Sequence, residues 1–182
     1  YWLDWRTANT LETLVEMTQE YQSAINRFYI DRLRHAKYRP TGGLLPFMFN
    51  DSNPAIQWSI VDYWRVPKRS YHAMRQAFHP QYIFTLLDRD SYAVGKPLDL
   101  PIYLVNDAHR AVPVQLEAEL FDPEGRLIAS AERALTLPPD CMAMEVDRLR
   151  LTPDRAGLYR LALALRQGEA TLVDHSYTVT VE

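Results

Sequence analysis

The sequence predicts a mixed fold: a helix, a buried strand and a second helix in residues 1–80, followed by an all-β, immunoglobulin-like sandwich in residues 81–182. Two observations support this prediction. The spacing of apolar residues changes from steps of three and four to strict alternation near Pro80, which indicates helices before this point and half-buried strands after it. Seven alternating runs then follow within about 100 residues, each bounded by Gly, Pro, Asp or Asn, as is typical of a β-sandwich.

The composition limits the possible partners. The chain has 182 residues, of which 47% are hydrophobic and 24% charged, as in ordinary globular proteins. A net charge of −3 offers no large basic surface, so we expect neither nucleic acid nor membrane as a partner. One cysteine excludes an internal disulfide, and the five scattered histidines form no metal-binding motif. We therefore expect no metal and no cofactor.

The chain opens on Tyr1-Trp2-Leu3-Asp4-Trp5, which leads us to expect a piece excised from a longer protein.

The first predicted helix extends from Asn9 to about Lys37. Asn9 can cap it, with Glu12 three residues later completing a capping box. The stretch 40–43, Pro-Thr-Gly-Gly, ends it. Its apolar positions recur at helical spacing: Leu11, Leu14, Met17, Tyr21, Ala24, Ile25, Phe28 and Leu33.

The second element is a short strand over 44–49, predicted to be buried on both faces because the run is apolar and bounded by glycines and by Asn50-Asp51. A second helix is expected from Pro67 to Phe78. One such strand between two helices cannot form a parallel sheet alone. Its edges must be paired upstream in a longer protein, paired between copies, or held in another arrangement, so the isolated chain is expected to self-associate through this strand.

The sandwich strands are predicted from period-two runs, as in VQLEAELF (114–121), where apolar residues alternate with Gln and Glu. The stretch DPEGR (122–126) is a predicted hairpin turn, with Pro early and Gly at a position of positive φ. The seven runs are YIFTLLD, LDLPIYLVND, VPVQLEAELFD, RLIASAERALTL, CMAMEVDRL, GLYRLALALRQ and ATLVDHSYTVTV.

The stretch 21–80 carries a family resemblance. In the β-mannosidase branch of the family-2 glycoside hydrolases, the last barrel strand runs Gly-x-Leu-x-Trp-Gln-Leu-Asn-Asp and is followed by Cys-Trp-Pro, Ser-Trp, Asp-Tyr and Pro-Lys. This chain resembles that pattern with its spacing kept over about 30 residues. The matching positions are Gly43, Leu45, Asn50, Asp51, Pro54, Trp58, Asp62, Tyr63, Pro67, Lys68 and Tyr71.

The resemblance implies that residues 1–80 are the last βα unit of a truncated (β/α)8 barrel, in a retaining exo-β-glycosidase that hydrolyses terminal β-glycosides. Such enzymes use two glutamates at short separation on earlier strands. Residues 1–10 contain no Glu, so the chain is expected to lack both catalytic glutamates and to be inactive alone. The missing barrel strands, supplied in cis, and a carbohydrate are the partners implied for the full-length protein.

The resemblance also implies four substrate-binding candidates: Phe47, Asn50, Asp51 and Trp58. Phe47, Met48 and Ser52-Asn53 depart from the pattern, which has Trp, Gln and Cys-Trp at these places. Altered specificity and lost activity are both open as the meaning of these departures. For Phe47 a substrate wall and a core position are both open, and for Trp58 packing in the core or loop is favoured over contact with the sugar. Asp51 is also open to interpretation as a loop anchor that accepts backbone N–H groups, and Asp62 looks similar.

A carbohydrate-binding or purely structural sandwich without hydrolase activity is the alternative function. Sugar-binding sandwiches expose planar aromatic side chains. Here most aromatics precede Tyr82, and those in the strands are expected in the core: Tyr92, Tyr103, Tyr159 and Tyr177.

Overall fold

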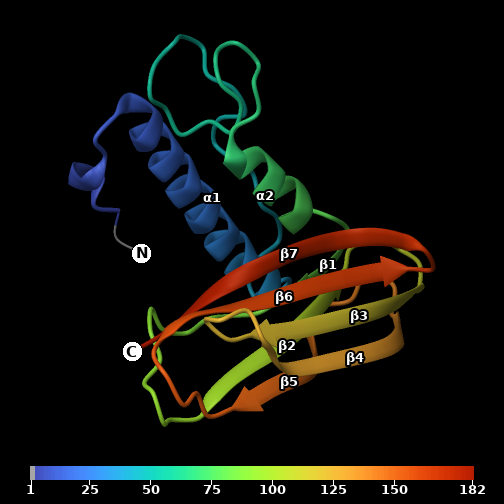
Figure 1. Ribbon diagram of the computed structural model, residues 1–182. Helices are drawn as coiled ribbons and strands as arrows, with labels where there is room; N and C mark the ends of the chain where they lie inside the picture. Colours follow the sequence, from blue (N-terminus) through green and yellow to red (C-terminus); the bar gives the residue numbers. More distant parts are fainter. Residues whose placement is uncertain (1–2) are drawn as a thin grey trace.

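The computed structural model describes residues 3–182, which form two helices packed against a two-layered β-sandwich (Figure 1). The helices are α1 (Leu11–His35) and α2 (Arg69–Ala77), and a short 3-10 turn, Trp5–Thr7, precedes α1. The strands are β1 (Gln81–Phe84), β2 (Leu98–Asn106), β3 (Val112–Phe121), β4 (Leu127–Leu137), β5 (Met144–Leu151), β6 (Gly157–Gln167) and β7 (Ala170–Val181). Within the described residues, no helix has the length and apolarity needed to cross a bilayer.

Helix α1 forms where the apolar residues recur at helical spacing, which lets one face pack against α2 and the sandwich. Its N-cap is Thr10, whose hydroxyl accepts a hydrogen bond from the Thr13 amide at 3.1 Å. The predicted cap at Asn9 is therefore wrong by one residue. Asn and Thr both cap helices well, and the sequence alone does not show which of two neighbours takes the extended conformation. Helix α2 begins at Arg69, two residues after the predicted start.

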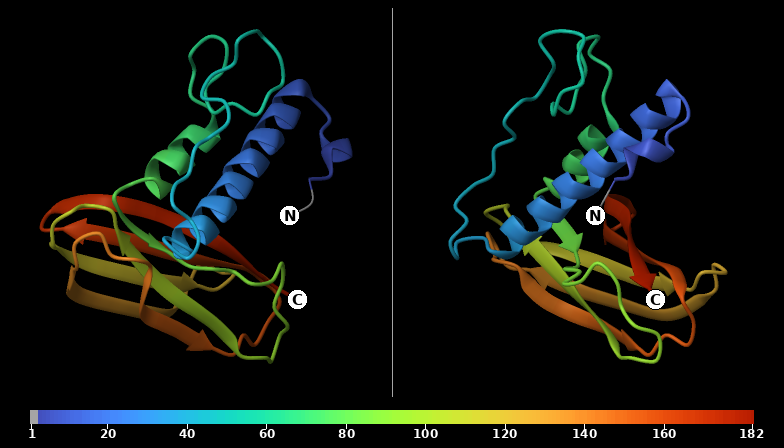
Figure 2. Two further views of the ribbon diagram at one scale, coloured as in Figure 1. Left: turned by 180° about the vertical axis from the view of Figure 1, so that it is seen from behind. Right: turned by 90° about the vertical axis from the view of Figure 1, so that its left-hand side faces the viewer.

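The segment 44–49 does not form the predicted strand in the described chain. It runs in an extended course back past the helices (Figure 2). Its large apolar side chains include three that are exposed: Leu45 by 96%, Phe47 by 85% and Phe49 by 58%. The prediction that it is buried on both faces is therefore wrong for this chain. A strand of this kind needs a neighbour on each edge to pair its N–H and C=O groups, and residues 3–182 place no strand beside it.

The seven predicted strands are all present within residues 81–182 and form two antiparallel sheets. One sheet has the order β1-β2-β5 and the other has the order β4-β3-β6-β7. In antibody constant domains the fourth strand lies with the first, second and fifth, whereas here β4 pairs with β3. The sandwich prediction is confirmed as an architecture, with the fourth strand in the other sheet.

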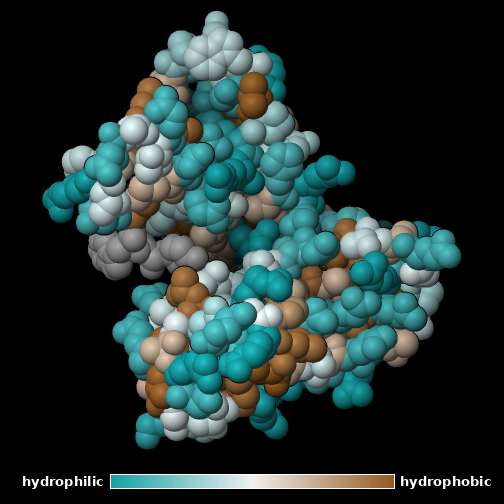
Figure 3. Space-filling model, in the orientation of Figure 1, coloured by the Kyte–Doolittle hydropathy of each residue, from teal (hydrophilic) through white to brown (hydrophobic). Residues whose placement is uncertain are grey.

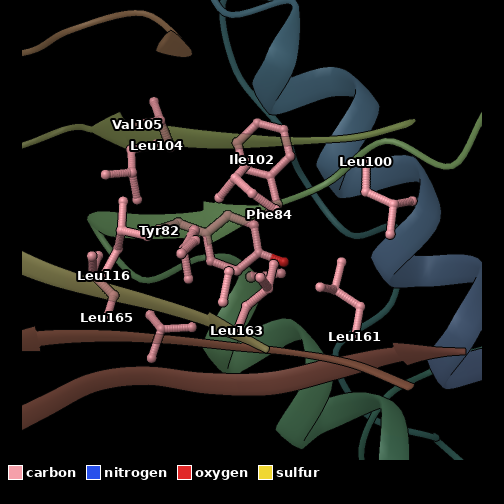
Figure 4. Packing of buried hydrophobic residues seen from close by; sticks show 14 of the residues in the cluster. Tyr82, Phe84, Leu100, Ile102, Leu104, Val105, Leu116, Leu161, Leu163 and Leu165 are labelled. Atoms are coloured by element: carbon pink, nitrogen blue, oxygen red, sulfur yellow. The ribbon is translucent and has the colours of Figure 1, made fainter. Parts of the chain in front are cut away.

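The core lies between the two sheets, and Figure 4 shows side chains of β1, β2, β3 and β6 that contribute to it. Two aromatic residues of β1 join it, since Tyr82 and Phe84 are fully buried and their rings stack at 5.5 Å. The alternation read from the sequence thus places one face of each strand in the core. The fully buried aliphatic side chains include Leu98, Leu100, Ile102, Leu104, Leu116, Leu120, Leu137 and Leu161.

Helix α1 is held to both sheets by one buried carboxylate. Asp31 is 2% exposed and accepts hydrogen bonds from the hydroxyls of Tyr82, at 2.8 Å, and Tyr177, at 2.7 Å. Tyr82 belongs to the β1-β2-β5 sheet and Tyr177 to the β4-β3-β6-β7 sheet. The Asp31 carboxylate therefore joins the helix to each layer of the sandwich.

The end of α1 makes a second polar contact with the sandwich loops. Arg34 forms an ion pair with Asp107, and Lys37 lies 2.9 Å from Asp107 and 2.7 Å from Asp140. The Arg34 guanidinium also donates to the backbone carbonyl of His79 at 2.8 Å. Because Arg34 is only 6% exposed, these partners replace the water that its charge has lost.

The groups around Asp31 have shifted pKa values. Burial raises the pKa of Asp31 from 3.8 to about 6, although the hydrogen bonds from Tyr177 and Tyr82 oppose this change. Burial lowers the pKa of His175 from 6.5 to about 3, and the Arg27 guanidinium adds to this effect. The neutral His175 ring lies 2.9 Å from the Ile83 carbonyl through Nε2 and stacks on Tyr82 at 5.4 Å.

These two shifts act on stability with opposite signs. Between about pH 4 and pH 6 the folded chain keeps a proton on Asp31 that the unfolded chain has released, so Asp31 makes the free energy of unfolding fall as pH rises. Between about pH 3 and pH 6.5 the unfolded chain binds a proton on His175 that the folded chain excludes, so His175 makes this free energy rise with pH. Their effects nearly cancel where the windows overlap.

We expect Asp31→Asn to remove the Asp31 effect and leave that of His175. The free energy of unfolding of the variant should then rise between pH 4 and pH 6 about 1.4 kcal/mol per pH unit more steeply than that of the wild type. Urea unfolding at pH 4, 5 and 6 measures both slopes. Glu169→Gln, at an exposed position, is the control and should keep the wild-type slope. Equal slopes for the wild type and Asp31→Asn would contradict the prediction.

The predicted hairpin turn at 122–126 is confirmed. Asp122 accepts hydrogen bonds from the amides of Glu124 at 3.0 Å and Arg126 at 2.9 Å, and Gly125 has φ of +79°. Pro123 of this turn packs against Gly157 at the start of β6, where a Cβ would lie 2.5 Å from the proline Cγ. This close contact ties the turn to the neighbouring strand.

We expect Gly157→Ala to destabilise the chain more than Gly168→Ala. At Gly157 the added methyl group would overlap Pro123 in a backbone with φ of +144°, whereas at Gly168, with φ of +58°, nothing lies within 4 Å. Gly168→Ala should therefore cost about 1 kcal/mol, from backbone strain alone. Urea unfolding at pH 7 compares the two variants. A smaller loss for Gly157→Ala would show that the turn moves away freely.

Candidate functional site

The loop 50–68, which leads into α2, arches beyond the end of the helices that is remote from the sandwich (Figures 1 and 2). Phe47 belongs to the extended segment 44–49, whereas Asn50, Asp51 and Trp58 belong to the loop 50–68 that leads into α2. Both ends of this loop are hydrogen-bonded to its residues Ile60 and Val61. The Asp51 amide donates to the Val61 carbonyl at 3.0 Å, and the Lys68 amide donates to the Ile60 carbonyl at 2.9 Å.

The structure brings Phe47 and Trp58 together. Their ring centroids are 6.0 Å apart with an interplanar angle of 71°, and the indole N–H donates to the Met48 sulfur at 3.0 Å. Trp58 is 70% exposed and Phe47 is 85% exposed. The two rings therefore form an apolar wall that is open to solvent, and Phe47 does not occupy a core position in this chain. Planar apolar faces of this kind suit contact with a ligand ring.

Asp51 is not part of this wall. It is 2% exposed, its Oδ2 lies 2.9 Å from Lys68 Nζ, and its Oδ1 accepts a hydrogen bond from the Ser59 hydroxyl. Burial opposes ionisation, but Ser59 and Lys68 outweigh it, so the pKa of Asp51 lies below its ordinary value of 3.8. Asp51 thus anchors the loop through side chains rather than through the backbone amides that the sequence suggested. Asn50 is half-buried and donates to the Asp51 carbonyl at 3.1 Å.

The second loop carboxylate is also occupied. Asp62 Oδ1 accepts a hydrogen bond from the Val66 amide at 2.8 Å, which closes a turn that presents Trp64 at its apex. Asp51 and Asp62 therefore both serve the loop itself. Among residues 3–182, no group of three or more His, Cys, Asp or Glu side chains is placed to hold a metal ion.

An apolar hollow of about 560 Å³ lies between the aromatic wall and the helices. Its lining residues are Asn26, Tyr29, Ile30, Leu33, Leu44, Leu45, Pro46, Phe47, Met48, Trp58, Ile60, Met74 and Phe78. On the face of the molecule seen in Figure 3, hydrophilic residues predominate and apolar residues are interspersed among them. Segment 44–49 and both helices thus share an uncovered apolar surface.

Two residues that support the wall were missed as site residues by sequence reasoning. Lys68 stands in the matching Pro-Lys pair, a signal that could have linked it to Asp51. Gln22 gives no such signal, because one Gln in an amphipathic helix is ordinary. It donates to the Trp58 carbonyl at 2.7 Å and the Ser59 carbonyl at 3.1 Å, across 36 and 37 residues of sequence.

Comparisons with known proteins give a partial similarity in sequence and a fuller one in fold. No model of a known protein family matches the chain. β-Mannosidase B of Aspergillus niger is 38% identical over 77 residues, which are 41% of this chain and 9% of that protein. β-Mannosidase B of Aspergillus terreus is 36% identical over the same length. The matched region thus spans about a tenth of these relatives.

Two solved structures share the fold over nearly the whole chain. The β-D-mannosidase of Dictyoglomus thermophilum has a TM-score of 0.78 at 18% identity, covering 95% of this chain and 20% of that one. The exo-chitosanase CsxA of Amycolatopsis orientalis has a TM-score of 0.74 at 16% identity, with the same coverage. The predicted resemblance is confirmed as a partial similarity to family-2 β-mannosidase B, with the fold of the C-terminal region of such enzymes.

We expect Phe47→Ala to change the free energy of unfolding of this chain by no more than about 0.5 kcal/mol, because its side chain is exposed. Ile60→Ala is the contrast. Ile60 is 6% exposed, and truncating a buried aliphatic side chain costs about 2–5 kcal/mol. Chemical unfolding of both variants tests the difference. A large loss for Phe47→Ala would show that its ring packs into a core in solution.

Proposed function

We propose that this chain is the C-terminal part of a retaining exo-β-glycosidase of the β-mannosidase type, which hydrolyses terminal β-glycosides. In this proposal residues 1–80 are the last βα unit of a (β/α)8 barrel and residues 81–182 are the following sandwich. The two catalytic glutamates come from upstream strands, and the chain alone is inactive. The observation that carries the proposal is the 38% identity to β-mannosidase B over 77 residues.

The uncovered apolar surface supports this proposal. The exposed side chains of segment 44–49 and the 560 Å³ hollow beside them leave apolar area in contact with water. Large exposed apolar patches mark surfaces that bind a partner. We propose that upstream barrel strands, supplied in cis, cover this surface and pair with segment 44–49, which then becomes a strand. Without them, the isolated chain should self-associate through the same surface.

Phe47 and Trp58 are the groups that this chain would bring to the substrate. Their exposed rings form a wall beside the exit of segment 44–49, and active sites of (β/α)8 barrels lie at the C-terminal ends of the strands. The apolar face of a pyranose ring fits such a wall. The carbohydrate is therefore proposed as the substrate of the full-length protein, with these two rings as one side of its binding site.

The sandwich offers little support for a carbohydrate-binding module. Within residues 81–182 every Phe and Tyr side chain is buried or half-buried, including Tyr159 at 2% exposure. A sugar-binding sandwich needs exposed planar rings, so the hydrolase proposal is preferred.

The test is hydrolysis of chromogenic β-mannoside and β-galactoside by this chain and by a version extended upstream in its own gene through the barrel. We expect turnover by the extended protein alone. In that protein Trp58→Ala should lower kcat/KM about tenfold, the value of a lost stacking contact of about 1.4 kcal/mol.

Ile56→Ala is the matched control. Ile56 is 91% exposed in the same loop, outside the wall, and its replacement should leave kcat/KM unchanged. If the extended protein turned over no β-glycoside, the hydrolase proposal would fail. If Trp58→Ala left kcat/KM unchanged, the proposed wall would lie outside the substrate site.

A further inference from the structure

The loop 50–68 is closed by a buried ion pair. Lys68 Nζ lies 2.9 Å from Asp51 Oδ2, and the two side chains are 11% and 2% exposed. The ammonium also donates to the Gln57 carbonyl at 3.1 Å and to the Ser59 hydroxyl oxygen at 3.2 Å. The Lys68 ammonium thus has three hydrogen-bond acceptors, and the Asp51 carboxylate accepts from both Lys68 and Ser59. These bonds hold the pair in one geometry. We refer to Asp51 and Lys68 together as the loop clamp.

Stability alone does not explain the loop clamp. A buried ion pair contributes little more than well-packed apolar residues of similar volume, because both ions lose their hydration. What such a pair does provide is a defined geometry, since its charges tolerate few other arrangements.

The clamp acts on the backbone on both sides of Trp58. Lys68 bonds the carbonyl of Gln57, and Asp51 bonds the side chain of Ser59. Gln22 of α1 bonds the carbonyls of Trp58 and Ser59, and its own side-chain oxygen accepts from Ser70 of α2 at 2.8 Å. The backbone under the indole is therefore attached to the loop ends and to both helices.

The indole itself is left open to solvent. Trp58 is 70% exposed, and its ring contacts Phe47 and Met48. A ring on a restrained backbone loses little entropy when a ligand stacks on it, which is how preorganised sites gain affinity. A core position would instead bury the ring.

We propose that Asp51, Lys68 and Gln22 are positioning residues that hold Trp58, beside Phe47, as a preformed wall for a sugar ring, and that Asp51 itself does not touch the sugar. This inference rests on the proposed function. It replaces the sequence-based expectation that Asp51 contacts substrate with a role exerted through Lys68 and Ser59.

The first test uses the 182-residue chain and needs no activity. Lys68→Met leaves the Asp51 charge without its partner, whereas the double variant Asp51→Asn/Lys68→Met removes both charges at similar volume. Hydrogen exchange then reports the loop through three amides: that of Asp51, which donates to the Val61 carbonyl, and those of Ile60 and Val61, which donate to the Phe49 carbonyl just before the loop. Lys96→Met, at an exposed position, is the control.

We expect the loop amides to exchange at least about tenfold faster in both clamp variants, with the sandwich amides and the control unchanged. The double variant should regain thermal stability relative to Lys68→Met and still show the fast loop exchange. This outcome would show that the clamp restrains the loop independently of its effect on the stability of the fold. Wild-type loop exchange in both clamp variants would overturn the inference.

The second test uses the extended protein and chromogenic β-mannoside. With little change in kcat, Trp58→Ala should raise KM about tenfold and the double variant should raise it several-fold, because each removes binding rather than chemistry. If Trp58→Ala raised KM and the double variant did not, the positioning role would be wrong while the proposed function stood. If the extended protein hydrolysed nothing, the proposed function would fail, and loop exchange would still decide the role of the clamp.

Discussion

The carboxylate of Asp31 occupies a buried point where α1 meets both sheets, and the placement of the helices depends on it. It accepts a hydrogen bond from one tyrosine hydroxyl of each sheet, those of Tyr82 and Tyr177. The helix therefore cannot move along one sheet without breaking its hydrogen bond to the other. Arg34 and Lys37 extend this attachment to the sandwich loops. The joint is polar, and polar bonds of defined length and direction specify one orientation, whereas apolar contacts allow sliding.

This attachment reaches the candidate site through the helix itself. Helix α1 has 25 residues and is therefore about 37 Å long. Asp31 lies near its C-terminal end, while Gln22, more than two turns earlier, holds the backbone of Trp58. The aromatic wall is thus oriented by one rigid element that is anchored in the sandwich. Residues 81–182 present no exposed Phe or Tyr ring, and they contact this element at its C-terminal end.

Much of the fold could be predicted because its signals are local. Alternation gave the seven strands, and DPEGR gave a turn through the preferences of Pro and Gly. The strand over 44–49 was predicted from its apolar run, but a strand forms only with hydrogen-bonding neighbours, which no local pattern can supply. Asp31 looked like an ordinary polar residue of an amphipathic helix, since its burial depends on Tyr82 and Tyr177, 51 and 146 residues away. The partner of Asp51 was hidden for the same reason, because pairing across a loop is set by tertiary structure.

Helix α2 ends at Ala77 and β1 begins at Gln81, so three residues separate them. A sequence boundary can be drawn there, at the change from helical to alternating spacing. The ionic and hydrogen-bonded contacts cross that boundary, however, and bind the helices to the strands that follow. In protein engineering, a sandwich cut from this chain at this junction would lose the residues that its loops and tyrosines bind. A segment cut ahead of α1 would instead keep the helices and the sandwich together. A chimaera made at that point would then contain both partners of each contact between α1 and the sandwich.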